Sequence, residues 1–432
     1  MQKRHASLLD ANYPTHNCVV DIERRERASV LCNTIIHRIR AAAVWPQASF
    51  IVPIEIMTDH LKPIKFAQPE LDELTIEAVT DVLRSHQLTS GPKTVAFEAA
   101  LSATFGGRPT RVVTSATAAM ELALQVCGVG PGDEVITSAQ SFFSTMNMIV
   151  KCGAIPKFVD CDLESRTIDL EQVERAITAR TKAIMPTHFP GSLVDMDALM
   201  ALAGKYDLRI IEDAALVQGS HWQGRAIGSF GDVTTFSFHP NKNMTTIEGG
   251  AIVVNSEEEA RRIDVLRFHG IRRLPDGTRD VDEAAGKFNM SDVSAAIGLR
   301  QLQQLDGFLE KRETLVSRYF QGFPEIAGAV LPPQAVPRQS WNMFCVLFPF
   351  SATRFSRHAF RNELERRGIL TGVSYEALHT TSLGRKLGYA EGQFPNAERI
   401  SRETVTLPLH VGMSEENVDR VCRTVAEVWH AL

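Results

Sequence analysis

The sequence predicts an α/β fold with a mostly parallel sheet, followed by a smaller α/β region. Apolar strands alternate with amphipathic helices along the middle of the chain, which is typical of a parallel sheet covered on both faces. The length of 432 residues suits a large α/β domain joined to a smaller one. The expected elements are helix 71–83, strand 156–159, helix 170–177, strand 183–186, helix 195–205, helix 257–268 and a polar, mobile loop at 271–285.

The first 56 residues differ from the rest of the chain. They carry a basic cluster at Arg24, Arg25 and Arg27 and show no clear succession of strands and turns. They also lack the basic, apolar and small-residue order of a secretory signal. Two alternatives remain open: translation starts at Met57, or the segment is a poorly ordered tail.

Three parts are therefore expected. Residues 1–56 form an N-terminal extension, residues 57–305 the large domain and residues 306–432 the small domain. The small domain should contain a long helix from about 305, a strand at 344–348, a helix at 357–367, a strand-like stretch at 370–373 and a closing helix from about 415, capped by Ser414.

Composition excludes several classes of partner. The net charge of −5 gives no reason to expect nucleic acid or an anionic membrane. No apolar run approaches the length of a membrane span. The seven cysteines form no CxxC pairs, which is typical of reduced thiols in a cytoplasmic protein.

The stretch 111–124 passes from a short strand through small hydroxyl residues into a helix. Such a turn points the free N–H groups and partial positive charge of a helix N-terminus beyond the end of the strand. An anion could bind there. The alternative is an ordinary helix cap at Ser115 or Thr117, which is the commoner use of these residue types.

Two ionisable residues stand at the ends of apolar strands. Lys242 lies between the apolar strands around 233–238 and 251–254, where burying a cation is costly. It is either an exposed loop residue or an amine kept neutral to attack a carbonyl. Asp213 ends the apolar strand 208–213, where an unpaired carboxylate is costly, unless it caps a helix.

The residues around Lys242 carry a family resemblance. Residues 237–246 (SFHPNKNMTT), followed by Glu248 and two glycines, resemble the Schiff-base segment of the DegT/DnrJ/EryC1/StrS aminotransferases. These fold-type-I enzymes use pyridoxal 5'-phosphate (PLP) and act mostly on keto sugars. The resemblance runs from about Pro63 to the C-terminus. It implies a mostly parallel seven-stranded sheet with helices on both faces, plus a smaller C-terminal α/β domain.

The resemblance implies roles at the cofactor ring. Lys242 would form the Schiff base and, once freed, move a proton between substrate and cofactor carbons. Asp213 would pair with the protonated pyridine nitrogen, which keeps the ring an electron sink. Phe142 would stack on the ring, although a core phenylalanine is the alternative at that position.

The resemblance also implies how the phosphate is held. Ala116, Thr117 and Ser237 would bind it within one chain, and Asn289 would reach it from the partner subunit. A homodimer with shared active sites is therefore expected, and no metal is. The loop 86–92 should likewise approach the partner's site. A helix cap is the structural alternative for Asn289.

Two departures from the family pattern affect the site. Leu216 stands where relatives usually have Gln or His, and leucine cannot hydrogen-bond to the cofactor. Relatives that aminate a UDP-linked 4-keto-pentose read approximately His-Phe-Arg where this chain has Ser374 and Glu376, ahead of His379. These three are candidate substrate-binding residues. A glutamate there would repel a diphosphate.

The sequence therefore predicts a PLP-dependent aminotransferase of amino-sugar biosynthesis. The resemblance implies L-glutamate as amino donor and a keto sugar, linked to a nucleotide, as acceptor. The first alternative is a non-nucleotide ketone such as an inosose, which Glu376 favours. The second is a non-catalytic regulator on the same fold, against which the presence of Lys242, Asp213 and Asn289 together argues.

Overall fold

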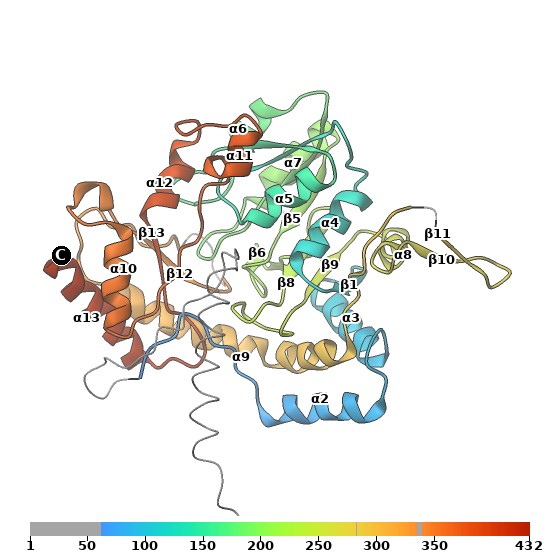
Figure 1. Ribbon diagram of the computed structural model, residues 1–432, viewed down its shortest axis with the longest axis horizontal. Coiled ribbons are helices and arrows are strands. Elements are labelled where there is room, and N and C mark those ends of the chain that lie inside the picture. The colour runs from blue at the N-terminus through green and yellow to red at the C-terminus, as the bar shows by residue number, and fades with distance from the viewer. Residues whose placement is uncertain (1–61, 282, 335–338) are drawn as a thin grey trace, which may run out of the picture. The chain divides into compact units, whose positions relative to one another are not determined.

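The computed structural model describes residues 62–281, 283–334 and 339–432 (Figure 1). The expected extension over 1–56 and the alternative start at Met57 lie outside these residues. Within the described ranges, no helix is both long and apolar enough to cross a membrane. The chain enters through two helices that precede the sheet, α2 (Glu73–Ser85) and α3 (Pro92–Thr104).

A seven-stranded sheet forms the centre of the larger part. The strand pairs from β8 to the edge strand β3 are parallel, while β9 runs antiparallel to both of its neighbours. The expected mostly parallel seven-stranded sheet is confirmed. In spatial order the strands are β1 (Thr110–Val113), β9 (Gly250–Val253), β8 (Val233–Ser237), β5 (Arg209–Asp213), β4 (Thr181–Met185), β2 (Glu134–Ser138) and β3 (Ile155–Val159).

Helices cover both faces of this sheet, because successive strand residues point to opposite sides. Ile210 packs in the apolar cluster under α3, α6 and α7, whereas Ile211 packs in the cluster under α4, α5 and α8. The helices lie within two residues of the sequence expectation where one was made. They are α4 (Ala116–Val126), α5 (Phe143–Lys151), α6 (Leu170–Ala176), α7 (Met196–Tyr206) and α8 (Glu257–Leu266).

One long helix, α9 (Asp292–Gly322), connects the sheet region to the C-terminal part. It packs against α2 and α3 at one end and against α13 at the other. The expected helix from about 305 therefore begins earlier. Residues 305 and 306, between which the sequence analysis placed a domain boundary, both lie within this continuous helix.

The C-terminal part is a small α/β unit built around an antiparallel strand pair. The expected strand at 370–373 is reduced to one bridge between Gly372 and Thr406. Ser414 caps the last helix in a capping box with Asn417, as the sequence predicts for the cap. The elements are β12 (Phe344–Leu347), η1 (Phe350–Ala352), α10 (Arg357–Arg366), η2 (Leu378–Thr380), α11 (Ser382–Lys386), α12 (Pro395–Glu403), β13 (Thr404–Leu407) and α13 (Glu415–Ala431).

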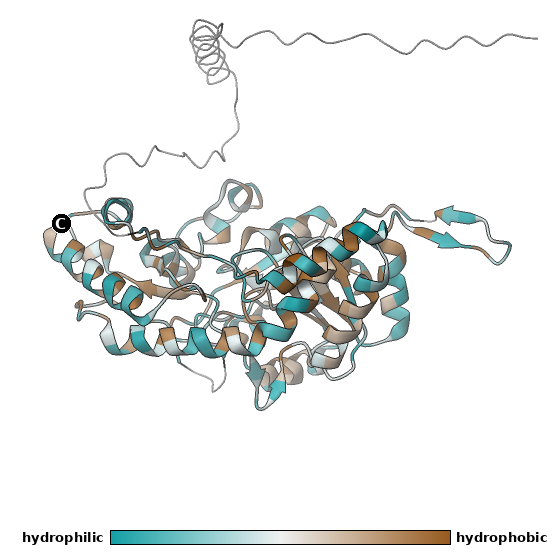
Figure 2. Cartoon of the chain, turned by 90° about the horizontal axis from the view of Figure 1, so that it is seen from below, coloured by the Kyte–Doolittle hydropathy of each residue, from teal (hydrophilic) through white to brown (hydrophobic). Residues whose placement is uncertain are grey.

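The expected loop at 271–285 contains a hairpin, β10 (Ile271–Arg273) and β11 (Arg279–Val281). Gly277 allows the turn through its positive φ of 85°. Figures 1 and 2 show the hairpin extending beyond α8, with a largely hydrophilic surface. A second small hairpin, β6 (His221–Trp222) and β7 (Arg225–Ala226), lies between β5 and β8 in the chain.

Candidate active site

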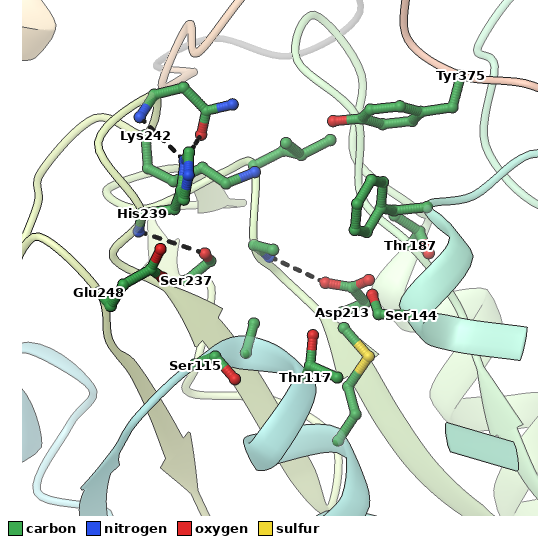
Figure 3. A pocket seen from close by; sticks show the side chains of 16 residues that line it. Ser115, Thr117, Ser144, Thr187, Asp213, Ser237, His239, Lys242, Glu248 and Tyr375 are labelled. Carbon is green, nitrogen blue, oxygen red and sulfur yellow. Dashed lines mark hydrogen bonds between the residues drawn. The ribbon is translucent and has the colours of Figure 1, made fainter. Parts of the chain in front are cut away.

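A pocket of about 230 Å³ opens beyond the carboxyl ends of β5 and β8, where ligands usually bind in parallel sheets (Figure 3). Segments that follow β1, β2, β4, β5 and β8 form its wall, together with Tyr375 from the C-terminal part. Six of the predicted cofactor-binding residues line it together: Ala116, Thr117, Phe142, Asp213, Ser237 and Lys242.

Lys242 extends into the pocket from the loop between β8 and β9 (Figure 3). Backbone hydrogen bonds close this loop, with the Thr246 N–H donating to the Phe238 carbonyl at 2.9 Å. Burial lowers the pKa of Lys242 to about 8, and the charge of Asp213 opposes that shift. At pH 7 about a tenth of the amine is therefore uncharged, far more than at the ordinary pKa, and the uncharged amine is the form that attacks a carbonyl.

Asp213 lies at the floor of the pocket and is 2% exposed. Its Oδ1 accepts a hydrogen bond from the Ala215 N–H at 3.1 Å. Burial raises the pKa of Asp213, and the Ala215 N–H and the charge of Lys242 oppose that rise. Within the described residues no Lys or Arg forms a salt bridge with it. The carboxylate is thus available to a cationic group entering the pocket.

The first turn of α4 forms the opposite end of the pocket. Ser115 is its N-cap and accepts from the Ala118 N–H at 3.0 Å, so the sequence alternative of a cap at this residue is realised. The N–H groups of Ala116 and Thr117 make no hydrogen bond within the described residues. Gly250 permits close approach of β9, because a Cβ there would lie 2.6 Å from the Ala116 nitrogen. This turn can therefore hold an anion.

Two aromatic residues from distant parts of the chain meet at the pocket. Phe142, the N-cap residue of α5, is 47% exposed, so it is not a core residue. Its ring lies edge to face with that of Tyr375, with 5.3 Å between the ring centroids. Sequence reasoning missed Tyr375, although it stands between the two flagged residues Ser374 and Glu376. The signal that could have identified it was an aromatic side chain next to two candidate substrate-binding residues.

Other pocket residues were given no cofactor role from the sequence. Ser115 was predicted only as a helix cap, and His239, Asn241 and Glu248 were quoted only as part of the segment around Lys242. Met120, Ser144, Thr187 and Ala215 also line the pocket, and these residue types carry no signal without the fold. Leu216, noted as a departure from the family pattern, does line the pocket and is 3% exposed.

Four predicted site residues do not line this pocket. Asn289 donates to the hydroxyls of Thr89 at 3.1 Å and Ser90 at 2.9 Å, in the loop before α3. Ser374 lines a neighbouring cavity that shares Tyr375 and Asn241 with the main pocket. The remaining two, Glu376 and His379, line neither cavity.

The local contacts of these two residues are structural. His379 is completely buried, and its Nε2 lies 2.9 Å from Glu398 Oε1. Glu376 is exposed and acts electrostatically on Arg357 and Arg361, which belong to α10. The negative charge of Glu376 therefore interacts with these two arginines of the C-terminal part.

The pocket residues fit PLP. The cofactor offers an aldehyde for an amine, a pyridine nitrogen that becomes cationic when protonated, and a phosphate. The pocket supplies a partly neutral lysine, a buried carboxylate without a cation, and a helix N-terminus. Phe142 adds an exposed aromatic face against which a flat ring can pack.

Comparison with known proteins agrees with this arrangement. The model of the DegT/DnrJ/EryC1/StrS aminotransferase family matches residues 69–426. The spore coat polysaccharide biosynthesis protein SpsC of Bacillus subtilis is 37% identical over 381 residues, which cover 86% of this chain and 97% of SpsC.

Solved structures show the same likeness. The PLP form of Spr1654 from Streptococcus pneumoniae has a TM-score of 0.79 and 32% identity, covering 85% of this chain and 99% of that one. Helicobacter pylori PseC, an aminotransferase involved in the biosynthesis of pseudoaminic acid, has a TM-score of 0.80 and 28% identity, covering 86% and 100%. The chain therefore belongs to the DegT/DnrJ/EryC1/StrS family and is a PLP-dependent aminotransferase of fold type I.

Proposed function

We propose that this aminotransferase moves an amino group from L-glutamate to the carbonyl of a nucleotide-linked keto sugar. Family membership makes it an aminotransferase for a sugar-like acceptor. The single observation that carries the catalytic assignment is the position of Lys242. Its amine shares one pocket with Asp213 and the start of α4. The regulator alternative is accordingly set aside.

Lys242 acts twice in this proposal. Its neutral amine would hold the cofactor through the aldehyde carbon, with loss of water. The free amine would serve as the base and acid that moves a proton between the donor α-carbon and the cofactor side. Bound PLP supplies the electron sink and stores the amino group between the two half-reactions.

The other residues bind and orient. Asp213 stabilises a protonated pyridine nitrogen, and Phe142 packs on the ring face. The first-turn N–H groups of α4, at Ala116 and Thr117, hold the phosphate together with Ser237, which is 8% exposed beside them.

Nucleotide linkage is supported by the placement of Glu376. Glu376 lines neither cavity, and the nearby cations Arg357 and Arg361 of α10 offset part of its charge, which reduces its repulsion of a diphosphate. SpsC and PseC, named for a coat polysaccharide and for pseudoaminic acid, are consistent with an acceptor of the sugar class.

A second candidate acceptor is a ketone without a nucleotide, such as an inosose. Among the residues that line the pocket in the described chain, none is arginine, the side chain best suited to a diphosphate. One structural neighbour, at 28% identity, is a synthase of 3-amino-5-hydroxybenzoic acid. The product in that name carries no nucleotide.

We also propose a homodimer. Asn289 is joined to Thr89 and Ser90, so the two segments expected to reach the partner's site form one surface. The nearby helix α2 exposes apolar side chains that a partner subunit could cover, including Leu74 at 52% and Leu83 at 53%.

The cellular location follows from the thiols. The five cysteines in the described chain are free, which supports a cytoplasmic location.

A half-reaction tests the proposal. The purified enzyme is loaded with PLP, treated with L-glutamate, and followed through the absorption band of the lysine-bound cofactor. Glutamate should bleach the band, and a UDP-linked 4-keto sugar should restore it, as ping-pong kinetics requires. Recovery only with uncharged cyclitol or free-sugar ketones would favour the second acceptor.

The control is Lys242→Ala, which should bind PLP without forming the lysine-bound band and should lose transfer by about a thousandfold. A wild-type band that glutamate never bleaches would overturn the choice of donor.

A further inference from the structure

Three buried hydroxyl groups form a chain that ends at Asp213. Thr145 lies in α5, Ser141 precedes that helix, and Thr187 follows β4; they are 0%, 0% and 3% exposed. Ser141 Oγ lies 2.8 Å from the hydroxyl oxygens of both threonines. The hydroxyl of Thr145 lies 3.4 Å from Asp213 Oδ2.

The direction of every hydrogen bond in this chain follows from the carboxylate. An ionised carboxylate only accepts, so Thr145 donates its single proton to Asp213. Thr145 must then accept from Ser141, and Ser141 must accept from Thr187. All three hydroxyls therefore donate toward the carboxylate, and aligned hydrogen bonds of this kind polarise one another.

The chain also determines how the carboxylate is oriented. The Ala215 N–H donates a hydrogen bond to Asp213 Oδ1, and the Thr145 hydroxyl donates one to Oδ2. Each carboxylate oxygen therefore has one donor. Without Thr145, Oδ2 would have no hydrogen-bond donor among the described residues. Burial disfavours the charged form of Asp213, and each donor that remains offsets part of this effect.

We propose that Thr145, supported by Ser141 and Thr187, is a positioning residue that holds Asp213 ionised and oriented toward the ring nitrogen of PLP. The inference rests on the contact between Asp213 and that nitrogen in the proposed function. It adds a role for the first turns of α5, which carry Phe142 at the ring face and Thr145 behind the carboxylate.

The test compares three variants. Thr145→Val keeps the side-chain shape and removes the hydroxyl, whereas Thr145→Ser keeps the hydroxyl. Thr137→Val is the matched control, because Thr137 is also completely buried but donates to the Met185 carbonyl at 2.7 Å. Two quantities are measured: the PLP dissociation constant of the apoenzyme and the nitrogen-15 resonance of ring-labelled PLP in the holoenzyme.

Thr145→Val should weaken PLP binding about tenfold or more and shift the resonance toward that of the unprotonated ring nitrogen, because a hydrogen bond to a charged group is lost. Thr145→Ser should remain close to wild type in both quantities, and so should Thr137→Val. Equal values for Thr145→Val and Thr137→Val would overturn the inference.

Two further outcomes are separable. Should Thr145→Val fail to fold, Ser141→Ala removes the donor to Thr145 and is judged by the same two quantities. An unprotonated ring nitrogen in the wild-type enzyme would contradict the proposed role of Asp213 itself. A protonated wild-type ring that is unaffected by Thr145→Val would contradict only the role of the hydroxyl chain.

Discussion

Lys242 and Asp213 lie in the same pocket, and each acts on the pKa of the other against the effect of burial. Burial lowers the pKa of Lys242 and raises that of Asp213, while their opposite charges shift both pKa values back. Before the cofactor binds, each residue therefore partly compensates the other. In the loaded enzyme, Lys242 would hold the cofactor aldehyde and Asp213 would face a cationic ring nitrogen, so neither would need the charge of the other.

Replacing Asp213 by asparagine should show this coupling. The variant keeps the size of the side chain and removes its charge, so PLP should bind about tenfold more weakly and amino transfer should slow by about a hundredfold or more. The pKa of Lys242 should fall below about 8, since Asp213 raises it. The pH dependence of the rate of PLP attachment measures that shift; an unchanged profile would contradict the coupling.

The apoenzyme should be stabilised by Lys242→Met at neutral pH. The folded-state pKa of Lys242, about 8, lies below the ordinary value of 10.5, so the unfolded chain binds more protons between these values. The stability of the wild type therefore rises with pH across that window. The advantage of Lys242→Met, about 1–3 kcal/mol at pH 7, should shrink from pH 8 to 10.5.

Denaturant unfolding of both apoproteins at several pH values measures this difference. PLP must be removed first, because it binds only the folded state. An advantage that grows with pH would show that Lys242 is not desolvated.

Gly250 and Gly307 should respond in opposite ways to alanine. A Cβ at Gly250 would lie 2.5 Å from the Ser115 carbonyl carbon, so Gly250→Ala should displace the start of α4. We expect a loss of about 2 kcal/mol or more and weaker PLP binding. Gly307, in α9, has nothing within 4 Å of the added carbon, and Gly307→Ala should gain about 0.5–1 kcal/mol. Thermal unfolding and PLP titration of both variants compare them directly.

Leu216→Gln should restore a hydrogen-bonding side chain to the pocket wall. Because the position lines the pocket, the added amide can reach a bound cofactor, and we expect PLP affinity to rise a few-fold and the absorption band to shift. Leu216→Met provides the control of similar size without an amide. Equal spectra and affinities for the two variants would show that this position does not contact the cofactor.

The periodicity of the sequence predicted the sheet and its covering helices because these elements depend on local pattern and burial. It could not predict which side chains of the segment 374–379 face the pocket. Tyr375 faces it, while His379 pairs with Glu398, a partner that no short-range spacing indicates. The cap at Ser115 could be predicted because a helix start has a local signature, whereas the role of Lys242 was predicted from the family resemblance of the residues around it.

The contact between Phe142 and Tyr375 also bears on synthesis of the chain. A ribosome completes the sheet loops that carry Phe142, Asp213 and Lys242 well before it reaches Tyr375. A nascent chain at that stage has most of the cofactor contacts but lacks one wall of the pocket. PLP should therefore bind stably only after the C-terminal part has emerged from the ribosome and docked. Cofactor binding is then a late step in the synthesis and folding of the chain.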